Sequence, residues 1–336
     1  MQISLLEIAT VTLAAILLPQ NDSATAQWSA ETVPLPEAVS EVRQSSEGVY
    51  AKAGVWYQLS ACALAPICAE ESEPAASDVP EGGIPDGLVA TAREGDGIRR
   101  AWYSSPTDRY AHGALGDFIE GGALVAEDVF GKLYVATLDP SEVFEDLTPR
   151  IADIDNDGRN EIITIRSSVR SGAAIAVYGL QGSRLIERAA TPPIGRANRW
   201  LNIAGIADFT GNGQLDIAIV KTPHIGGRLE ILAWNRNRLE VVDSAEGFSN
   251  HAFGSIDQGL SAAAKIDGDR IPDLVLPDAQ RRSLRMVTAA RGKIREILSL
   301  PLPARVETTI GVVSDSKPPT FAAGLSDGSL VWVTAQ

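Results

Sequence analysis

The chain has 336 residues, and its 29 Lys and Arg against 43 Asp and Glu give a formal net charge of −14. A surface with this excess of negative charge repels phosphate backbones and anionic lipids, which argues against nucleic-acid binding and against attachment to a membrane surface. Apolar residues make up 45% of the chain and charged residues 21%, as in an ordinary globular protein. The 30 Gly, 19 Pro and 3 His favour many short strands and turns over long helices.

The first residues have the pattern of a secretory signal peptide. An apolar run at residues 8–18, too short to span a bilayer, precedes the small residues Ala24-Thr25-Ala26. We therefore expect cleavage before Gln27 and a periplasmic or secreted protein. No Lys or Arg occurs before Arg43, and Glu7 stands where positive charge is usual. The alternatives are a translation start further upstream, or an apolar stretch buried in the fold.

Cys62 and Cys68 are the chain's two cysteines. An even pair, close together in an exported protein, favours a disulfide that closes a small loop. Two buried free thiols are the alternative if the protein is not exported. Residues 70–86 are rich in Pro, Gly and acids and predict a linker. The expected domains are a signal peptide at 1–26, an N-terminal extension at 27–83 and a repeat domain at 84–336.

Three segments superimpose without gaps: residues 151–165, 206–220 and 263–276. Each consists of a short apolar strand, a polar loop and a β-branched strand, and a predicted hairpin with a small polar turn follows each one. The segments start 55 and 57 residues apart. Antiparallel units of four strands, repeated at spacings of this size, are typical of β-propeller blades. The sequence therefore predicts an all-β fold, a β-propeller.

The innermost strands of a propeller converge on its axis, where bulky side chains would collide. Segments 114–116, 204–207 and 261–264 are dominated by small residues. We expect each of them to be the first strand of a blade.

Two incomplete units stand at the ends of the repeat region. Residues 115–144 resemble a blade whose first loop has lost its acids, and residues 309–332 supply inner strands without an outer one. We expect the N- and C-terminal strands to close the ring, with residues 98–102 in the same sheet as 329–333. This closure predicts five blades, and six if residues 46–69 add strands.

The first loop reads Asp153-x-Asp155-x-Asp157-Gly158-x-x-Glu161, a calcium-loop pattern. Carboxylates at alternate positions converge on one cation when the backbone curls around it. The loop is not an EF-hand, because its twelfth position is Thr164 and a strand follows it. The expected ligands are the side chains of Asp153, Asp155, Asp157 and Glu161 and the backbone carbonyl of Arg159.

The acidic loop recurs in each repeat between a short strand and a longer one. In this respect the chain resembles the FG-GAP/VCBS-type repeat proteins. Blades of this type occur in integrin α-subunits and in many secreted bacterial proteins. The resemblance covers about residues 84–336. It implies a β-propeller with Ca²⁺ bound between the first and second strands of its blades, and it implies no single activity.

The three loops differ in their charge. The second offers Asp208, Thr210, Asn212 and Asp216, two formal charges in place of four, so weaker Ca²⁺ binding is expected. The third has Lys265 at the first ligand position, where its ammonium can neutralise the acids of the loop, Asp267, Asp269 and Asp273, and we expect no metal there. The alternative for all three loops is a solvated acidic turn.

The connections at the opposite ends of the strands carry all three histidines together with arginines and aromatic residues. This grouping indicates a binding surface for an anionic or sugar-like ligand. Ordinary loop composition, with aromatic rings that plug the channel mouth, is the alternative. The candidate ligand-binding residues are Arg109, Tyr110, His112, Arg170, Arg199, Trp200, His224, Asn250 and His251.

The sequence contains no nucleophile elbow, no phosphate-binding Gly loop and no His-Glu-x-x-His motif, so no catalytic residue is assigned. We expect an exported, monomeric, Ca²⁺-stabilised propeller that binds a protein, a carbohydrate or an anionic ligand without catalysis. The alternative is an enzyme, a hydrolase or lyase that acts on a polysaccharide or a phosphorylated ligand at the His and Arg loops.

Overall fold

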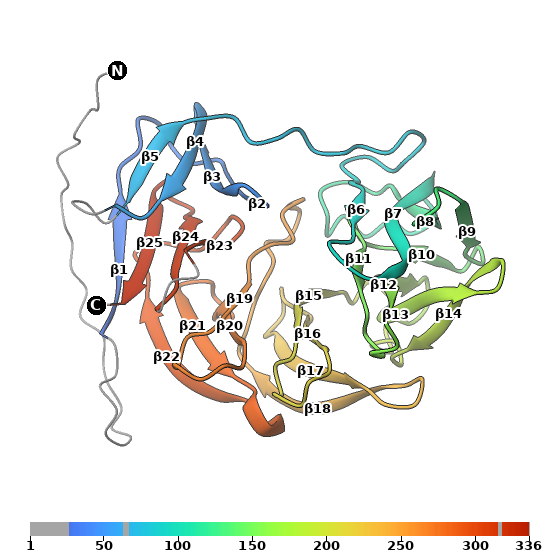
Figure 1. Cartoon of the computed structure of the whole chain (residues 1–336). Helices are drawn as coiled ribbons and strands as arrows, with labels where there is room; N and C mark the ends of the chain where they lie inside the picture. Colours follow the sequence, from blue (N-terminus) through green and yellow to red (C-terminus); the bar gives the residue numbers. More distant parts are fainter. Residues whose placement is uncertain (1–26, 63–66, 315–317, 336) are drawn as a thin grey trace. The chain divides into compact units, whose positions relative to one another are not determined.

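The computed structural model describes residues 27–62, 67–314 and 318–335, so the predicted signal peptide lies outside the described residues. The described chain consists of strands β1 to β25, and its one helix is the 3-10 turn Ala290–Gly292 (Figure 1). The all-β prediction is confirmed. Within the described residues, no helix has both the length and the apolar character that crossing a bilayer requires. The chain divides into two compact units: one combines the chain up to Ala75 with Gly259–Thr288 and the residues from Arg295 onward, and the other combines Ala76–Gln258 with Ala289–Ile294.

The first unit contains three four-stranded antiparallel sheets. The first sheet is formed by β2 (Glu41–Ser45), β3 (Gly48–Ala53), β4 (Val55–Ser60) and β5 (Cys68–Glu71). The second is formed by β19 (Ala262–Ala264), β20 (Asp273–Pro277), β21 (Ser283–Thr288) and β22 (Arg295–Pro301). The third has the order β1-β25-β24-β23 and combines β1 (Trp28–Val33) with β23 (Gly311–Ser314), β24 (Thr320–Gly324) and β25 (Leu330–Ala335).

The C-terminal sheet is completed by β1, in register from Trp28 opposite Ala335 to Val33 opposite Leu330. The prediction that residues 98–102 lie in the same sheet as 329–333 is therefore wrong, although an N-terminal strand does complete the C-terminal sheet. Residues 98–102 lie in a long strand that pairs with its sequence neighbours β6 and β8, and so both of its edges are already occupied.

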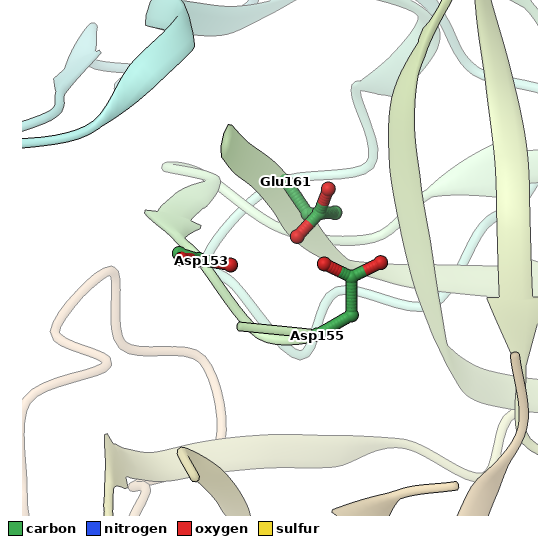
Figure 2. Close-up of side chains that lie close together, drawn as sticks. All are labelled: Asp153, Asp155 and Glu161. Carbon is green, nitrogen blue, oxygen red and sulfur yellow. The ribbon is translucent and has the colours of Figure 1, made fainter. Parts of the chain in front are cut away.

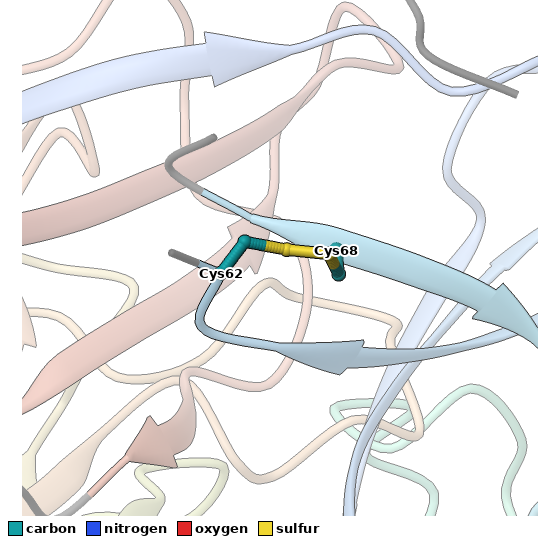
Figure 3. The surroundings of a disulfide bond; sticks show 2 residues. All are labelled: Cys62 and Cys68. Atoms are coloured by element: carbon teal, nitrogen blue, oxygen red, sulfur yellow. A yellow bond between two sulfur atoms is a disulfide. The ribbon is translucent and has the colours of Figure 1, made fainter. Parts of the chain in front are cut away.

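Residues 27–83, expected to be an extension ahead of the repeats, supply β1 to β5. Residues 41–71 among them form a complete four-stranded sheet, as the six-unit alternative requires. Cys62 and Cys68 form the predicted disulfide, which lies beside the connection between β4 and β5, with the two Cα atoms 5.6 Å apart (Figure 3).

The second unit contains a four-stranded and a nine-stranded sheet. The four-stranded sheet is β15 (Leu201–Ala207), β16 (Asp216–Lys221), β17 (Arg228–Trp234) and β18 (Leu239–Glu246). The nine-stranded sheet joins two runs of four strands through β10 (Glu142–Phe144), which pairs with β8 and with β12. The first run is β6 (Ala90–Thr91), β7 (Asp96–Thr107), β8 (Glu120–Asp128) and β9 (Leu133–Thr137). The second run is β11 (Arg150–Ala152), β12 (Arg159–Ser168), β13 (Gly172–Gln181) and β14 (Arg184–Ala190).

Two of the three small-residue segments lie in the first strands of four-stranded sheets, β15 and β19. Segment 114–116 is not a strand, so the prediction that it is the first strand of a blade is wrong. Gly116 there has φ of 99°, a conformation that favours glycine and that turns the chain instead of extending it. Ala114 and Leu115 are nevertheless buried, so small size at this place serves the packing of a loop.

The second strand of each repeat is buried on both faces. Strands β12, β16 and β20 are rich in Ile, Val and Leu, which suit a pleated strand with neighbours above and below. Near the start of each stands the last acid of the preceding loop: Glu161, Asp216 and Asp273, all at most 2% exposed. The rigid middle of each sheet therefore holds one carboxylate of each loop in place.

Candidate functional site

The first loop connects β11 to β12 and gathers three acids. One carboxylate oxygen from each of Asp153, Asp155 and Glu161 lies within 4.8 Å of the other two, and Figure 2 shows the Asp155 and Glu161 side chains facing each other. The Asp153 carboxylate accepts the backbone N–H groups of Asp157 at 3.0 Å and Gly158 at 2.8 Å, which curls the loop. Asp157, a fourth predicted ligand, is outside this group and accepts the N–H of Arg159 at 2.8 Å.

Burial makes these carboxylates costly to ionise. Glu161 is 2% exposed, and its burial, followed by the charge of Asp155, raises its pKa to about 8. Burial and the neighbouring Asp157 also raise the pKa of Asp155, whose side chain is 10% exposed. Oxygen Oδ1 of Asp155 is buried without a hydrogen-bond partner. A cation among these oxygens would satisfy the unpaired atom and lower both pKa values.

An arginine that the sequence analysis did not consider reaches this loop. Arg188 Nη2 lies 2.9 Å from Asp155 Oδ2, and Arg188 Nη1 lies 3.7 Å from Glu161 Oε1. Arg188 comes from β14, 33 positions after Asp155. Hairpin prediction gives an approximate register for β13 and β14, but it does not show which side chains turn toward the loop.

The second loop connects β15 to β16 and has the same backbone design. The carboxylate of Asp208 accepts the N–H groups of Gly211, Asn212 and Gly213 at 2.7 to 2.9 Å. Asp216, 1% exposed, accepts the Thr210 N–H at 2.9 Å. Its Oδ1 and the Thr210 Oγ1 are buried and have no hydrogen-bond partner of suitable geometry. Burial raises the pKa of Asp216, so this loop also presents unmatched oxygens to a cation.

The third loop lacks the acid that organises the other two. Its first position is Lys265, whose side chain is exposed and takes part in none of the ion pairs found in the described parts of the chain. The expected neutralisation of Asp267, Asp269 and Asp273 by this lysine is therefore not observed. Burial raises the pKa of Asp273 to about 6, and its carboxylate accepts the Ile266 N–H at 2.9 Å.

The three histidines lie on loops of the second unit and share aromatic neighbours. Trp200 stacks on His224 at 5.9 Å between ring centroids and meets His251 edge-on at 4.7 Å. Phe253 contacts His224 at 5.2 Å and His112 at 6.1 Å, and Nε2 of His224 lies 2.9 Å from Nδ1 of His251. We call these five residues the His–aromatic cluster. The sequence placed His112, Trp200, His224 and His251 on loops at the same ends of the strands, and the structure brings these four side chains together with Phe253.

His112 is held by a buried acid. Its Nδ1 lies 2.5 Å from Oε1 of Glu145, which is fully buried and accepts a second hydrogen bond from the Ser167 hydroxyl. Burial raises the pKa of Glu145, and the bond to His112 opposes that effect. Trp200 Nε1 also donates to the backbone carbonyl of Glu145 at 2.9 Å. Glu145 was not a candidate, because no sequence spacing links it to residues of the distant loops.

The remaining candidates lie around the cluster without joining it. Tyr110 stands edge-on to His112 at 5.9 Å, whereas Asn250 is fully buried with both side-chain polar atoms unpaired. Arg109 donates to the Glu142 carbonyl at 2.8 Å and Arg199 to the Asn198 carbonyl at 3.1 Å. Arg170 is exposed. In the described structure, none of these arginines forms an ion pair or hydrogen bond with the cluster.

Residues 130–219 match the family model of the FG-GAP-like repeat. The chain contains an FG-GAP repeat. The matched segment includes both the first and the second loop, so the resemblance drawn from the loop pattern is confirmed there. No curated protein matches the chain. Among solved structures, an exotype rhamnogalacturonan lyase, YesX, is similar at 14% identity and a TM-score of 0.40, over 91% of this chain and 62% of the lyase.

The four-stranded antiparallel sheets of this chain, together with its FG-GAP-like repeat at residues 130–219, fit the blades of a β-propeller. The first loop connects β11 to β12 and the second connects β15 to β16, and the matched segment contains both loops. The number of blades stays a prediction.

Proposed function

We propose that this FG-GAP repeat protein is a binding module stabilised by Ca²⁺ in its first loop. The observation that supports this most is the buried, unpaired Oδ1 of Asp155 beside the carboxylates of Asp153 and Glu161. Hard oxygen ligands of this kind suit Ca²⁺. Asp157 and the Arg159 carbonyl stand next to the three acids in sequence and would complete the coordination. A bound cation would neutralise the loop and fix the connection between β11 and β12.

The second loop is a further calcium site in this proposal. Asp208, Thr210, Asn212 and Asp216 would supply its ligands, and two of the oxygens lack partners. With two carboxylates in place of four, its intrinsic attraction for Ca²⁺ is lower. The third loop, with Lys265 at its first position, is proposed to bind no metal.

The ligand surface is proposed to be the His–aromatic cluster, and its ligand a carbohydrate. Phe253 is 63% exposed and lies between His112 and His224, which are partly exposed. A flat ring of this kind packs against the apolar face of a sugar, while imidazole nitrogens bond to its hydroxyl groups. Because no hydrogen bond or ion pair joins Arg109, Arg170 or Arg199 to the cluster in the described structure, we favour an uncharged glycan over an anionic ligand.

Affinity gel electrophoresis with soluble neutral polysaccharides tests this ligand class. Phe253→Ala is expected to abolish the retardation of the wild-type protein, and His224→Ala to weaken it. Phe130→Ala removes an equally large ring, 91% exposed, from the turn between β8 and β9, and it is expected to change nothing. Equal migration of wild type and Phe253→Ala on every glycan, or retardation by acidic glycans alone, would reject the proposal.

An enzyme that acts on a polysaccharide is the second candidate, and the pair of His112 and Glu145 favours it. A buried carboxylate that bonds Nδ1 orients the ring and leaves Nε2 to take a proton, the arrangement of a general base. A screen for new reducing ends or unsaturated products, with His112→Ala as the control, separates the candidates. Turnover that disappears in His112→Ala would replace the binding module with a hydrolase or lyase.

The disulfide between Cys62 and Cys68 and the FG-GAP repeat are consistent with an extracellular or periplasmic location. We propose that the protein works there as a monomer.

A further inference from the structure

Arg188 occupies an irregular position in its strand. Along β13 and β14, Val177 pairs with Ala189 and Tyr178 pairs with Glu187, so Arg188 is the extra residue of a β-bulge. A bulge bends the strand and redirects the side chain of the unpaired residue. In this case the redirected side chain is a guanidinium that reaches Asp155 and Glu161.

The neighbouring strand leaves room for this side chain. A Cβ at Gly179 of β13 would lie 3.1 Å from Cγ and 3.3 Å from Nη1 of Arg188. The backbone of Gly179 is not in the left-handed region, so a larger residue there would crowd the Arg188 side chain without straining the backbone. Together the bulge and the glycine hold Arg188 across the strand.

The guanidinium satisfies only part of the acidic group. Nη2 of Arg188 bonds to Oδ2 of Asp155, while Oδ1 of the same carboxylate is buried without a partner. A small cavity next to the loop is lined by residues that include Asp157, Glu161 and Arg188. The arginine therefore neutralises charge in the loop and leaves one buried carboxylate oxygen of Asp155 without a hydrogen bond.

The other two repeats provide an internal comparison. Strands β18 and β22 have a bulge at the equivalent place. It lies opposite Ile231 and Leu232 of β17 in one repeat, and opposite Met286 and Val287 of β21 in the other. The extra residues there are Val242 and Ile297, which carry no charge. Only the loop with four acids therefore has a cation at this position.

We propose that Arg188 is a built-in competitor for Ca²⁺ at the first loop. In the metal-free protein it holds Asp155 and Glu161, and a cation that binds there displaces it. This inference rests on the proposed Ca²⁺ site. It implies that the first loop keeps its conformation without metal and binds Ca²⁺ more weakly than its four acids suggest, because each binding event must break the pairs with Arg188.

Calorimetric titration of Ca²⁺ into chelator-treated protein tests the proposal, with Asp208→Asn and Asp216→Asn in every sample to weaken the second loop. Arg188→Gln is expected to lower the Kd of the first loop at least about fivefold, the smallest common coupling between competing ligands. Without metal, Arg188→Gln should melt below the parent protein, and saturating Ca²⁺ should remove that difference. Arg188→Lys keeps a positive charge at the bulge, so its Kd is expected to lie between those of the parent protein and Arg188→Gln.

Arg184→Gln removes an exposed arginine from the same strand and is expected to leave the Kd unchanged. If Arg188→Gln binds Ca²⁺ and the parent protein does not, the proposal that Arg188 competes with Ca²⁺ is supported most strongly. Equal Kd values for the parent protein and Arg188→Gln would overturn the role of Arg188 and leave the site intact. Absence of binding in both, under conditions where both are folded, would overturn the calcium site itself.

Discussion

The indole ring of Trp28 stacks on the ring of Phe321, with 6.1 Å between their centroids. Trp28 begins β1, and Phe321 lies in β24, two strands away in the same sheet. Both side chains are buried in a core that includes Leu284 and Val333. The contact therefore joins the first described strand to the C-terminal sheet through side chains as well as through the β1–β25 hydrogen bonds.

Trp28→Ala is expected to lower the free energy of unfolding by about 3 kcal/mol, because it removes a large ring from this core and leaves a cavity. Urea unfolding followed by circular dichroism measures the change. Phe130→Ala, which removes an exposed ring, should change the free energy by less than about 0.5 kcal/mol. A Trp28→Ala protein as stable as this control would show that β1 contributes little to the sheet.

The stability of the protein is expected to fall as the pH rises because of Glu120. Burial, and then the charges of Glu145 and Asp117, raise its pKa from 4.5 to about 9. A raised carboxyl pKa stabilises the fold below the unfolded-state value, and that contribution is lost as the pH rises toward the folded-state value. The loss is at most about 1.4 kcal/mol for each pH unit between the two values.

Glu120→Gln cannot ionise, so its stability relative to the wild type should increase from pH 5 to pH 8. Urea unfolding at a series of pH values measures this difference, with the exposed Glu81→Gln as the control. A constant difference between Glu120→Gln and the wild type over this range would mean that Glu120 is ionised throughout.

Adjacent glycines before β17 should respond differently to substitution. A Cβ at Gly227 would lie 1.4 Å from the carbonyl oxygen of Phe248, whereas a Cβ at Gly226 meets nothing within 4 Å. Both have positive φ, 80° for Gly226 and 46° for Gly227. Gly226→Ala is expected to cost about 1 to 2 kcal/mol for its backbone conformation alone. Gly227→Ala should cost clearly more or prevent folding, and equal thermal unfolding of the two variants would contradict this packing.

Removal of the disulfide should have a modest effect. Cys62 and Cys68 are six positions apart, and closing so short a loop stabilises the fold by about 2 kcal/mol in the chain-entropy model. Reductant is expected to lower the urea midpoint of the wild type to that of Cys62→Ser/Cys68→Ser. A midpoint unaffected by complete reduction would show that the bond does not contribute to stability.

The sequence predicts the repeated parts of this fold well because local chemistry determines them. Polar loops with Gly158 or Gly213 require a turn, and the runs of Ile, Val and Leu after them require a buried strand. The hairpins that follow have small polar turns, such as Gln181-Gly182-Ser183, and the structure contains them as β13–β14, β17–β18 and β21–β22. The disulfide was predicted from two cysteines close together in a protein expected to be exported, with two free thiols as the alternative, and the structure contains it.

Long-range pairing was much harder to predict. No local pattern distinguishes β1 from residues 98–102 as the partner of β25, since each segment contains a tryptophan, Trp28 or Trp102. The buried acid Glu145 and the bulge at Arg188 are invisible for a related reason. Their roles depend on residues 33 positions away, His112 and Asp155, and on the register of the strands between them.

Thermal melting with and without Ca²⁺ tests most directly whether Ca²⁺ stabilises the protein. Cation binding to the folded state alone raises stability by mass action, about 2.7 kcal/mol per site at a hundredfold excess over Kd. The melting temperature of the wild type is expected to rise on addition of Ca²⁺ and to return with a chelator. Asp155→Ala should lose the part of this rise in melting temperature that comes from Ca²⁺ binding at the first loop. Asp267→Ala should show the same rise as the wild type. A wild-type melting temperature that is the same in chelator and in excess Ca²⁺ would contradict the account.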